Sequence, residues 1–272
     1  MVLLIFLTIK NYLIMRHLTK IYAIIFAFIL FSCSQNSENA LSIAGNYSLT
    51  NQAYYQGDSL TNPDMVVDNQ MKVYSDNGWM FIAIRDGIGA FSAGTYDMEG
   101  DLLTEHAVNV NPDSSGNNFT LRIVLTESGY NQIIDEILDN DGNAWKLEES
   151  YERHAAGESS DLDGLYRQSQ TLNIIDGDTT DASYNEFKMI HQGEFMWGAQ
   201  SKNEDGSIIN YVGHGTLTID GDMITEVLEE SSMEGITGTY KMTIVRNDNG
   251  FSQTTMDEKT GNSNIKTYIR IQ

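Results

Sequence analysis

One twelve-residue line occurs twice in this chain, and this repeat constrains the fold more than any other feature. The segment Gly94–Glu105 returns 121 residues later as Gly215–Glu226, and both follow the pattern G-T-x4-G-D-x2-T-E. Self-similarity of this kind indicates that the chain is built from two copies of one structural unit. Each copy then holds about 110 residues, the size of a small domain.

The copies also match outside this line, and the order of the matching segments is unchanged. The matches are Gly45–Tyr47 with Gly164–Tyr166, Met71–Val73 with Phe187–Met189, Phe119–Leu125 with Tyr240–Arg246, Ser128–Gln132 with Asn249–Gln253, and Tyr151–Arg153 with Tyr268–Arg270. A small, polar stretch separates the copies, as is typical of linkers. The sequence therefore predicts one domain over residues 43–154, a linker over 155–162 and a second domain over 163–272.

Each copy has the pattern of antiparallel β-structure. Phe119, Leu121, Ile123 and Leu125 alternate with more polar neighbours, which is the period of a half-buried strand. Turn pairs such as Asn-Gly and Asp-Gly recur every 8 to 15 residues or so, and they favour short hairpins. The best helix candidate is residues 130–138, although the alignment of the copies makes the same segment the start of a strand.

The ends of each copy carry a further resemblance. Each copy opens with Gly-x-Tyr and closes with Tyr-x-Arg, which places Tyr47 with Arg153 and Tyr166 with Arg270. This resembles the lipocalin-like, or calycin, pattern, in which Gly-x-Trp on the first strand meets an arginine from the last strand at the closed end of a barrel. The resemblance implies an all-β fold of two tandem antiparallel up-and-down β-barrels. A guanidinium that stacks on a ring would pack these barrel ends.

The N-terminal segment is typical of an export signal. Residues 1–32 hold no acidic residue, and a basic stretch precedes an apolar run of about 11 residues, too short for a membrane span of about 20. Met15 is the more natural start of this signal. The segment Leu30–Cys33 resembles the lipobox of bacterial lipoproteins, which implies that Cys33 is lipidated. Residues 33–42 then form a polar tether, and the protein is expected in the cell envelope, anchored to a membrane, most simply the outer one.

The charge of the chain excludes one class of partner. The chain has 16 Lys and Arg and 38 Asp and Glu, a net charge of −22. Residues 1–32 carry three of the basic residues, so without them the charge is 13 − 38 = −25. Such a surface repels polyanions, so nucleic acid is not an expected partner.

No motif in the sequence carries recognisable chemistry. The histidines lack the spacings of zinc sites, and no phosphate-binding loop or nucleophile elbow is present, so neither a catalytic residue nor a metal or other cofactor is predicted. Glu105 and Glu226 end the repeated line. Either these acids or their threonine neighbours must face the barrel interior, and an inward acid would mark a polar ligand contact. The other candidate ligand contacts are aromatic: Trp79, Phe81, Phe195 and Trp197.

Three functions remain open at this stage. The first is the binding of a small apolar or amphipathic ligand inside the barrels, since barrels of this size enclose a ligand or are filled by side chains. The second is a structural or interaction module of a cell-surface assembly, with an unknown protein partner. The third is a carbohydrate-active enzyme, which is the less expected function because the chain lacks a catalytic motif.

The predicted lipid anchor can be tested on Cys33. We expect the wild-type protein to incorporate a palmitate analogue during metabolic labelling and to fractionate with membranes. Cys33→Ala should lose both properties, because acyl chains supply the membrane affinity. A Cys33→Ala protein that stayed fully membrane-bound would refute the anchor.

Overall fold

The computed structural model describes residues 42–61, 69–76, 78–108, 118–138, 141–203, 205–257 and 259–272. The predicted signal, Cys33 and nearly all of the tether lie outside these residues. The described chain is all β-structure, and no helix in it is long and apolar enough to cross a membrane. Residues 44–272 form one compact unit.

The first copy folds into a closed antiparallel barrel. Its strands are β1 (Gly45–Gln56), β2 (Ser59–Leu60), β3 (Asn69–Tyr74), β4 (Trp79–Arg85), β5 (Ile88–Glu99), β6 (Leu102–Ala107), β7 (Asn118–Leu125), β8 (Gly129–Leu138) and β9 (Ala144–Arg153). From β3 onward each strand pairs with the next, and β9 pairs back with β1. The short β2 only extends the end of β1, so eight strands close the barrel.

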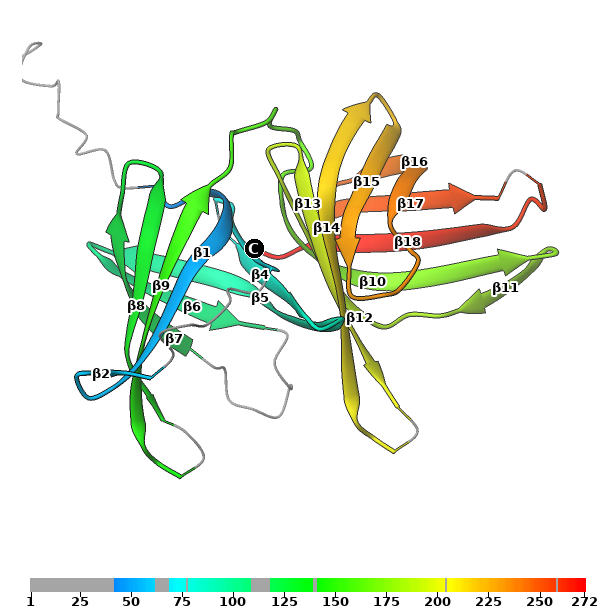
Figure 1. Cartoon of the computed structure of the whole chain (residues 1–272). Coiled ribbons are helices and arrows are strands. Elements are labelled where there is room, and N and C mark those ends of the chain that lie inside the picture. The colour runs from blue at the N-terminus through cyan, green and yellow to red at the C-terminus, as the bar shows by residue number, and fades with distance from the viewer. Residues whose placement is uncertain are drawn as a thin grey trace, which may run out of the picture. The chain divides into compact units, whose positions relative to one another are not determined.

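The second copy repeats this topology. Its strands are β10 (Gly164–Ile175), β11 (Asp178–Asp181), β12 (Asn185–His191), β13 (Glu194–Lys202), β14 (Ile208–Asp220), β15 (Met223–Ser231), β16 (Gly238–Asn247), β17 (Gly250–Met256) and β18 (Ser263–Arg270). Strand β18 pairs with β10, and β11 is the counterpart of β2. Even the irregularities match, since β1 has a bulge at Leu49/Asn51 and β10 has one at Gln168/Gln170. The lipocalin-like fold of two tandem barrels, expected from the sequence, is confirmed (Figure 1).

The glycine of the repeated line forms a tight hairpin in both barrels. Strands β5 and β6 are joined by Gly100-Asp101, and β14 and β15 by Gly221-Asp222. Gly100 has φ 64° and Gly221 has φ 57°. A type II′ hairpin needs a positive φ at the first loop position, which glycine adopts without a steric penalty.

The helix candidate at residues 130–138 was wrong. These residues belong to strand β8, which pairs with β7 and with β9. Tyr130 and Gln132 are buried on its inner face, in register with the inner residues of β9. Pairing on both edges outweighed the weak local preference of the segment for a helix.

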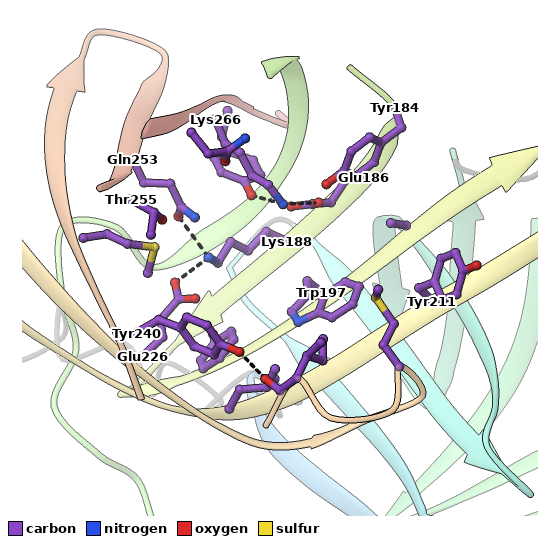
Figure 2. A pocket seen from close by; sticks show the side chains of 18 of the residues that line it. Tyr184, Glu186, Lys188, Trp197, Tyr211, Glu226, Tyr240, Gln253, Thr255 and Lys266 are labelled. Carbon is purple, nitrogen blue, oxygen red and sulfur yellow. Dashed lines mark hydrogen bonds and ion pairs between the residues drawn. The ribbon is translucent and has the colours of Figure 1, made fainter. Parts of the chain in front are cut away.

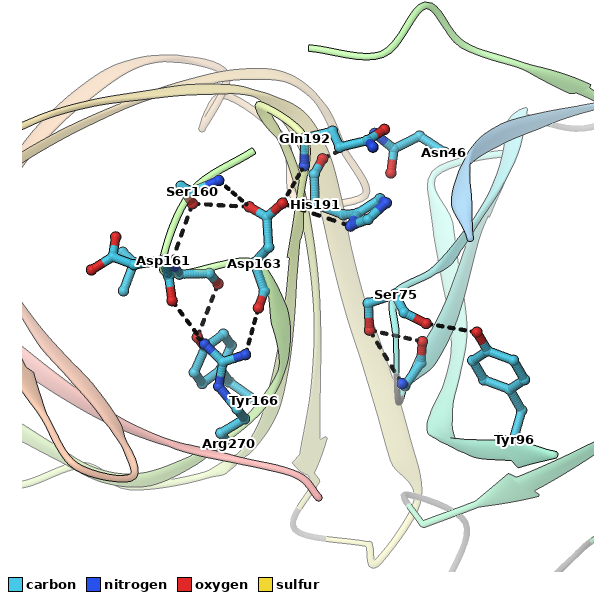
Figure 3. Close-up of polar contacts among 12 residues, drawn as sticks. Asn46, Ser75, Tyr96, Ser160, Asp161, Asp163, Tyr166, His191, Gln192 and Arg270 are labelled. Carbon is cyan, nitrogen blue, oxygen red and sulfur yellow. Dashed lines mark hydrogen bonds and ion pairs between the residues drawn. The ribbon is translucent and has the colours of Figure 1, made fainter. Parts of the chain in front are cut away.

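An arginine closes one end of each barrel. Arg270 lies over the ring of Tyr166, 5.0 Å from the ring centroid, and donates hydrogen bonds to the carbonyls of Asp161 and Asp163 (Figure 3). Burial raises the pKa of Tyr166 to about 12, although Arg270 opposes this, and the Tyr166 hydroxyl donates to Leu162. The predicted linker thus supplies acceptors to this end of the barrel.

The first barrel repeats this stack. The guanidinium of Arg153 lies 5.1 Å from the centroid of the Tyr47 ring and also hydrogen-bonds its hydroxyl. Inside the barrel, Tyr47 contacts Tyr130, which stacks on Tyr151, with ring centroids 4.8 Å apart in both pairs. The corresponding rings of the second barrel are Tyr166, Phe251 and Tyr268.

Outward-facing apolar residues of both barrels are buried in one common cluster. From the first barrel come Met71, Val73, Met80, Ile82, Phe91 and Ala93, and from the second Leu165, Phe187, Met189, Met196 and Val212. The packing leaves little space, since a Cβ on Gly198 would lie 2.4 Å from the ring of Phe91. Positions that would face water on an isolated barrel therefore form a second core.

The closed end gives a stability prediction. We expect Arg270→Ala to lower the free energy of unfolding by about 2 kcal/mol, because it removes a ring stack and two bonds to carbonyls. Urea denaturation would measure this loss. Arg122→Ala is the control, since Arg122 forms an exposed ion pair with Asp135 and should cost under about 1 kcal/mol. Equal losses in the two variants would contradict the role of Arg270.

Candidate ligand-binding site

The acids that end the repeated line face the interior of their barrels. Glu105 on β6 and Glu226 on β15 are both buried, whereas Thr104 points outward toward Thr120. Successive strand residues point to opposite faces, so only one residue of each Thr-Glu pair can lie inside. The structure thus selects the glutamate in both copies.

A lysine pairs with each of these buried acids. Lys72 on β3 lies with its Nζ 2.6 Å from Oε1 of Glu105, and it donates to Oε1 of Gln132 at 2.8 Å. These three residues form the Lys–Glu–Gln triad of the first barrel. A buried charge requires a partner of this kind, because leaving water is costly for either ion alone.

The second barrel contains the same triad at the equivalent positions. Lys188 on β12 forms an ion pair with Glu226 and donates to Oε1 of Gln253 at 3.0 Å. Lys72 pairs across strands with Tyr47 just as Lys188 pairs with Tyr166, which establishes that the positions correspond. The Lys–Glu–Gln triad is therefore common to both copies of the repeated unit.

A second charged group differs between the barrels. In the first barrel, Glu149 on β9 accepts bonds from Gln52, Gln132 and the hydroxyl of Tyr151. In the second barrel, Lys266 occupies the position of Glu149, because Lys266 pairs with Gln253 as Glu149 pairs with Gln132. One inner position thus carries opposite charges in the two copies.

Lys266 has its own partner within the second barrel. Its Nζ lies 2.7 Å from Oε2 of Glu186, and Glu186 also accepts a bond from the hydroxyl of Tyr268. Burial alone would lower the pKa of Lys266, but the facing Glu186 outweighs this and raises that pKa above its ordinary value. Burial, followed by the same carboxylate, raises the pKa of Tyr268 well above normal. Lys266 therefore stays charged and Tyr268 stays a hydrogen-bond donor at neutral pH.

These two ion pairs lie at the wall of a cavity in the second barrel. The cavity has a volume of about 510 Å³, within the range of small-molecule sites. Its polar lining includes Glu186, Lys188, Glu226, Gln253 and Lys266 (Figure 2). Its apolar lining includes Phe195, Trp197, Leu228, Met233, Ile236, Tyr240 and Met242. A cavity that presents both surfaces fits an amphipathic molecule.

The predicted aromatic residues have different positions in the two copies. Phe195 and Trp197 line the cavity of the second barrel. In the first barrel Trp79 is fully buried, donates from its indole nitrogen to the carbonyl of Thr95, and stacks on Phe81. The ammonium of Lys72 lies 5.4 Å from the Trp79 ring, so these aromatics pack around the Lys–Glu–Gln triad.

Sequence reasoning missed the lysines, the glutamines and Glu186. Lys72 and Lys188 are matched residues in the aligned copies, but a lysine between apolar neighbours reads as an exposed strand position. Their match, combined with the repeated glutamates, was the available signal. Glu186 and Lys266 carry no such signal, since the first copy has other residues there.

The four histidines among the described residues are dispersed and have separate partners. His154 forms hydrogen bonds with Glu194 and Ser48, and the bond with Glu194 raises the pKa of His154. Burial lowers the pKa of His191 and the pKa of His214. Across the described ranges, no three His, Cys, Asp or Glu residues lie close enough to hold a metal ion.

Comparison with known proteins gives few matches. No known family model and no curated protein matches the chain. One similar solved structure is a lipocalin-like protein from Bacteroides uniformis, with 17% identity and a TM-score of 0.28, covering 41% of this chain and all of that one. Another is an uncharacterized protein from Bacteroides eggerthii, with 16% identity and a TM-score of 0.27, covering 39% of this chain and 98% of that one.

A third similar structure spans more of the chain. It is a protein of unknown function from the DUF3598 family of Nostoc punctiforme, with 9% identity and a TM-score of 0.25, and the match covers 84% of this chain and 96% of that one. Likenesses this distant carry no functional argument. The fold assignment above rests on strand pairing and barrel closure within this chain.

The buried ion pair of the second barrel gives a direct test. We expect Lys188→Met to lower the free energy of unfolding by about 3–5 kcal/mol, because Glu226 would remain as an uncompensated buried charge. The double variant Lys188→Met/Glu226→Leu should recover most of this loss, since neither charge then remains. Urea denaturation of both variants measures the difference. A double variant as unstable as the single one would show that the two charges are not coupled.

Proposed function

We propose that the second barrel binds a small amphipathic molecule in its cavity. The observation that carries this proposal is the division of the cavity lining into an aromatic and aliphatic part and a part made of two lysine–glutamate pairs. The volume of about 510 Å³ suits a molecule with an apolar body and one polar head. The first barrel serves as a packing partner, since apolar residues on its outer surface are buried in a cluster shared with the second barrel.

The ion pairs favour binding over hydrolysis. A glycosidase needs two carboxyl groups free to exchange protons or attack a sugar carbon. Glu226 pairs with Lys188, and Glu186 pairs with Lys266 and also accepts a bond from Tyr268. Carboxylates held in this way can position a ligand, but they are poorly placed to act as an acid and a nucleophile.

We place this binding activity in the cell envelope. The support is the predicted export signal and the lipobox-like Leu30–Cys33, followed by a polar tether. A lipid on Cys33 would hold the barrels next to a membrane, where amphipathic molecules are concentrated. The labelling experiment on Cys33 tests this part of the proposal separately from ligand binding.

The binding proposal is tested by filling the cavity. Ala199 lines it, and Ala83 is its matched residue in the first barrel, because Ala199 pairs with Glu186 as Ala83 pairs with Gln70. We expect Ala199→Trp to weaken binding of a fluorescent apolar probe, Nile red, at least tenfold, because the indole would occupy the probe's space. Ala83→Trp should leave the affinity unchanged. Equal affinities in wild type and Ala199→Trp would count against the cavity as the binding site.

A further inference from the structure

The two repeated carboxylates differ in one hydrogen-bond donor. In the first barrel, Glu105 accepts from the hydroxyl of Tyr74 at 2.5 Å, in addition to its ion pair with Lys72. Tyr74 is fully buried, and burial followed by the Glu105 charge raises the pKa of Tyr74 well above normal, so its proton stays in place. A lysine and a hydroxyl together therefore satisfy this buried acid.

The second barrel lacks the hydroxyl at the matching position. Tyr74 pairs with Gly45, and its counterpart, which pairs with Gly164, is Ile190. A neighbouring ring also lacks its hydroxyl in the second barrel, because Phe251 occupies the position that Tyr130 has in the first. The hydroxyl that bonds the buried acid in the first copy, and that of the neighbouring Tyr130, are thus both absent from the second copy.

This loss occurs in the barrel whose acid lines a cavity. The side chain of Glu226 is 9% exposed and borders the 510 Å³ space. A carboxylate offers about four acceptor sites, and a buried acceptor without a donor is destabilising. In the first barrel the chain itself supplies a hydroxyl donor to this acid, whereas in the second barrel Glu226 borders the cavity, from which a ligand can reach it.

We propose that the ligand of the second barrel is a neutral amphiphile whose hydroxyl group donates to Glu226 from the cavity, a bond of the kind that the Tyr74 hydroxyl makes to Glu105. This inference rests on the proposed function and names the chemical class of its ligand. The apolar body of the ligand lies along Trp197, Leu228 and Met242 on the cavity wall.

The charges of the site disfavour the commonest alternative head group. A fatty-acid carboxylate would meet the carboxylates of Glu226 and Glu186, and both nearby lysines are already paired with these acids. A like charge in this buried setting is repelled more strongly than in water. The site therefore selects an alcohol over an acid of the same chain length.

Three probes of equal chain length test this selectivity in the full-length protein. Isothermal titration calorimetry with octanol, octyl methyl ether and octanoate should give at least tenfold tighter binding for octanol. The ether replaces the hydroxyl proton with a methyl group and so lacks the donor but keeps the oxygen, and octanoate adds the negative charge. Ether or octanoate binding as tightly as octanol would overturn the hydroxyl assignment and leave the binding proposal standing. Failure of all three and of Nile red to bind would instead refute the proposed function.

A pair of variants tests the position of the hydroxyl. Ile190→Tyr restores the residue found in the first barrel, and we expect it to abolish the preference for octanol over the ether, because the chain then supplies the donor itself. Ile190→Phe is matched in size and should retain the preference. The readout is the ratio of the affinities for octanol and for the ether. A larger side chain that reduces the cavity weakens binding of both probes, so this ratio does not depend on the loss of space. An unchanged ratio in Ile190→Tyr would contradict the proposal, and if that variant does not fold, the three probes decide it with the wild-type protein.

Discussion

The pairing of the first strand with the last is the constraint on which the rest of the structure depends. Strand β1 pairs with β9, and β10 with β18, so each sheet closes on itself and has no long free edge. Closure creates an interior shielded from water. In that interior an unpaired charge is costly, so a buried lysine and glutamate form an ion pair. Closure also fixes which arginine meets which tyrosine, because Tyr47 lies opposite Arg153 and Tyr166 opposite Arg270 in the register.

The polar centre of each barrel contains the same three residue types, but the residues that surround it differ between the two copies. Both retain the Lys–Glu–Gln triad, but the first barrel surrounds it with Tyr74, Tyr130 and Tyr151, which supply rings and hydroxyls from the chain. The second has Ile190 and Phe251 in two of these positions and a cavity beside its acid. The buried acid thus receives a hydroxyl donor from the chain in the first barrel and borders a cavity in the second.

Much of the fold could be predicted because its signals are local or repeated. Alternating residues predicted strands, Gly-Asp pairs predicted hairpins, and the Gly-x-Tyr and Tyr-x-Arg ends predicted closure. The helix candidate at residues 130–138 failed because strand pairing on both sides outweighed local preference. The candidate site was predicted in part: the repeat singled out Glu105 and Glu226, but not their partners, because Lys72 and Lys188 lie far from these acids in sequence.

The sequence by itself determined that this chain has two copies of a β-unit, which residues end each unit, and that one of Thr or Glu enters each interior. These properties follow from periodicity and spacing, which can be read along a single chain. The tertiary structure alone decided that the glutamates face inward, that Lys72 and Lys188 pair with them, and that Glu226 borders a cavity in the second barrel. It also decided that Met71, Phe91 and Phe187 form a core outside both barrels. Such outcomes depend on distances across the sheet, which are set when the strands close and the two outer faces pack together.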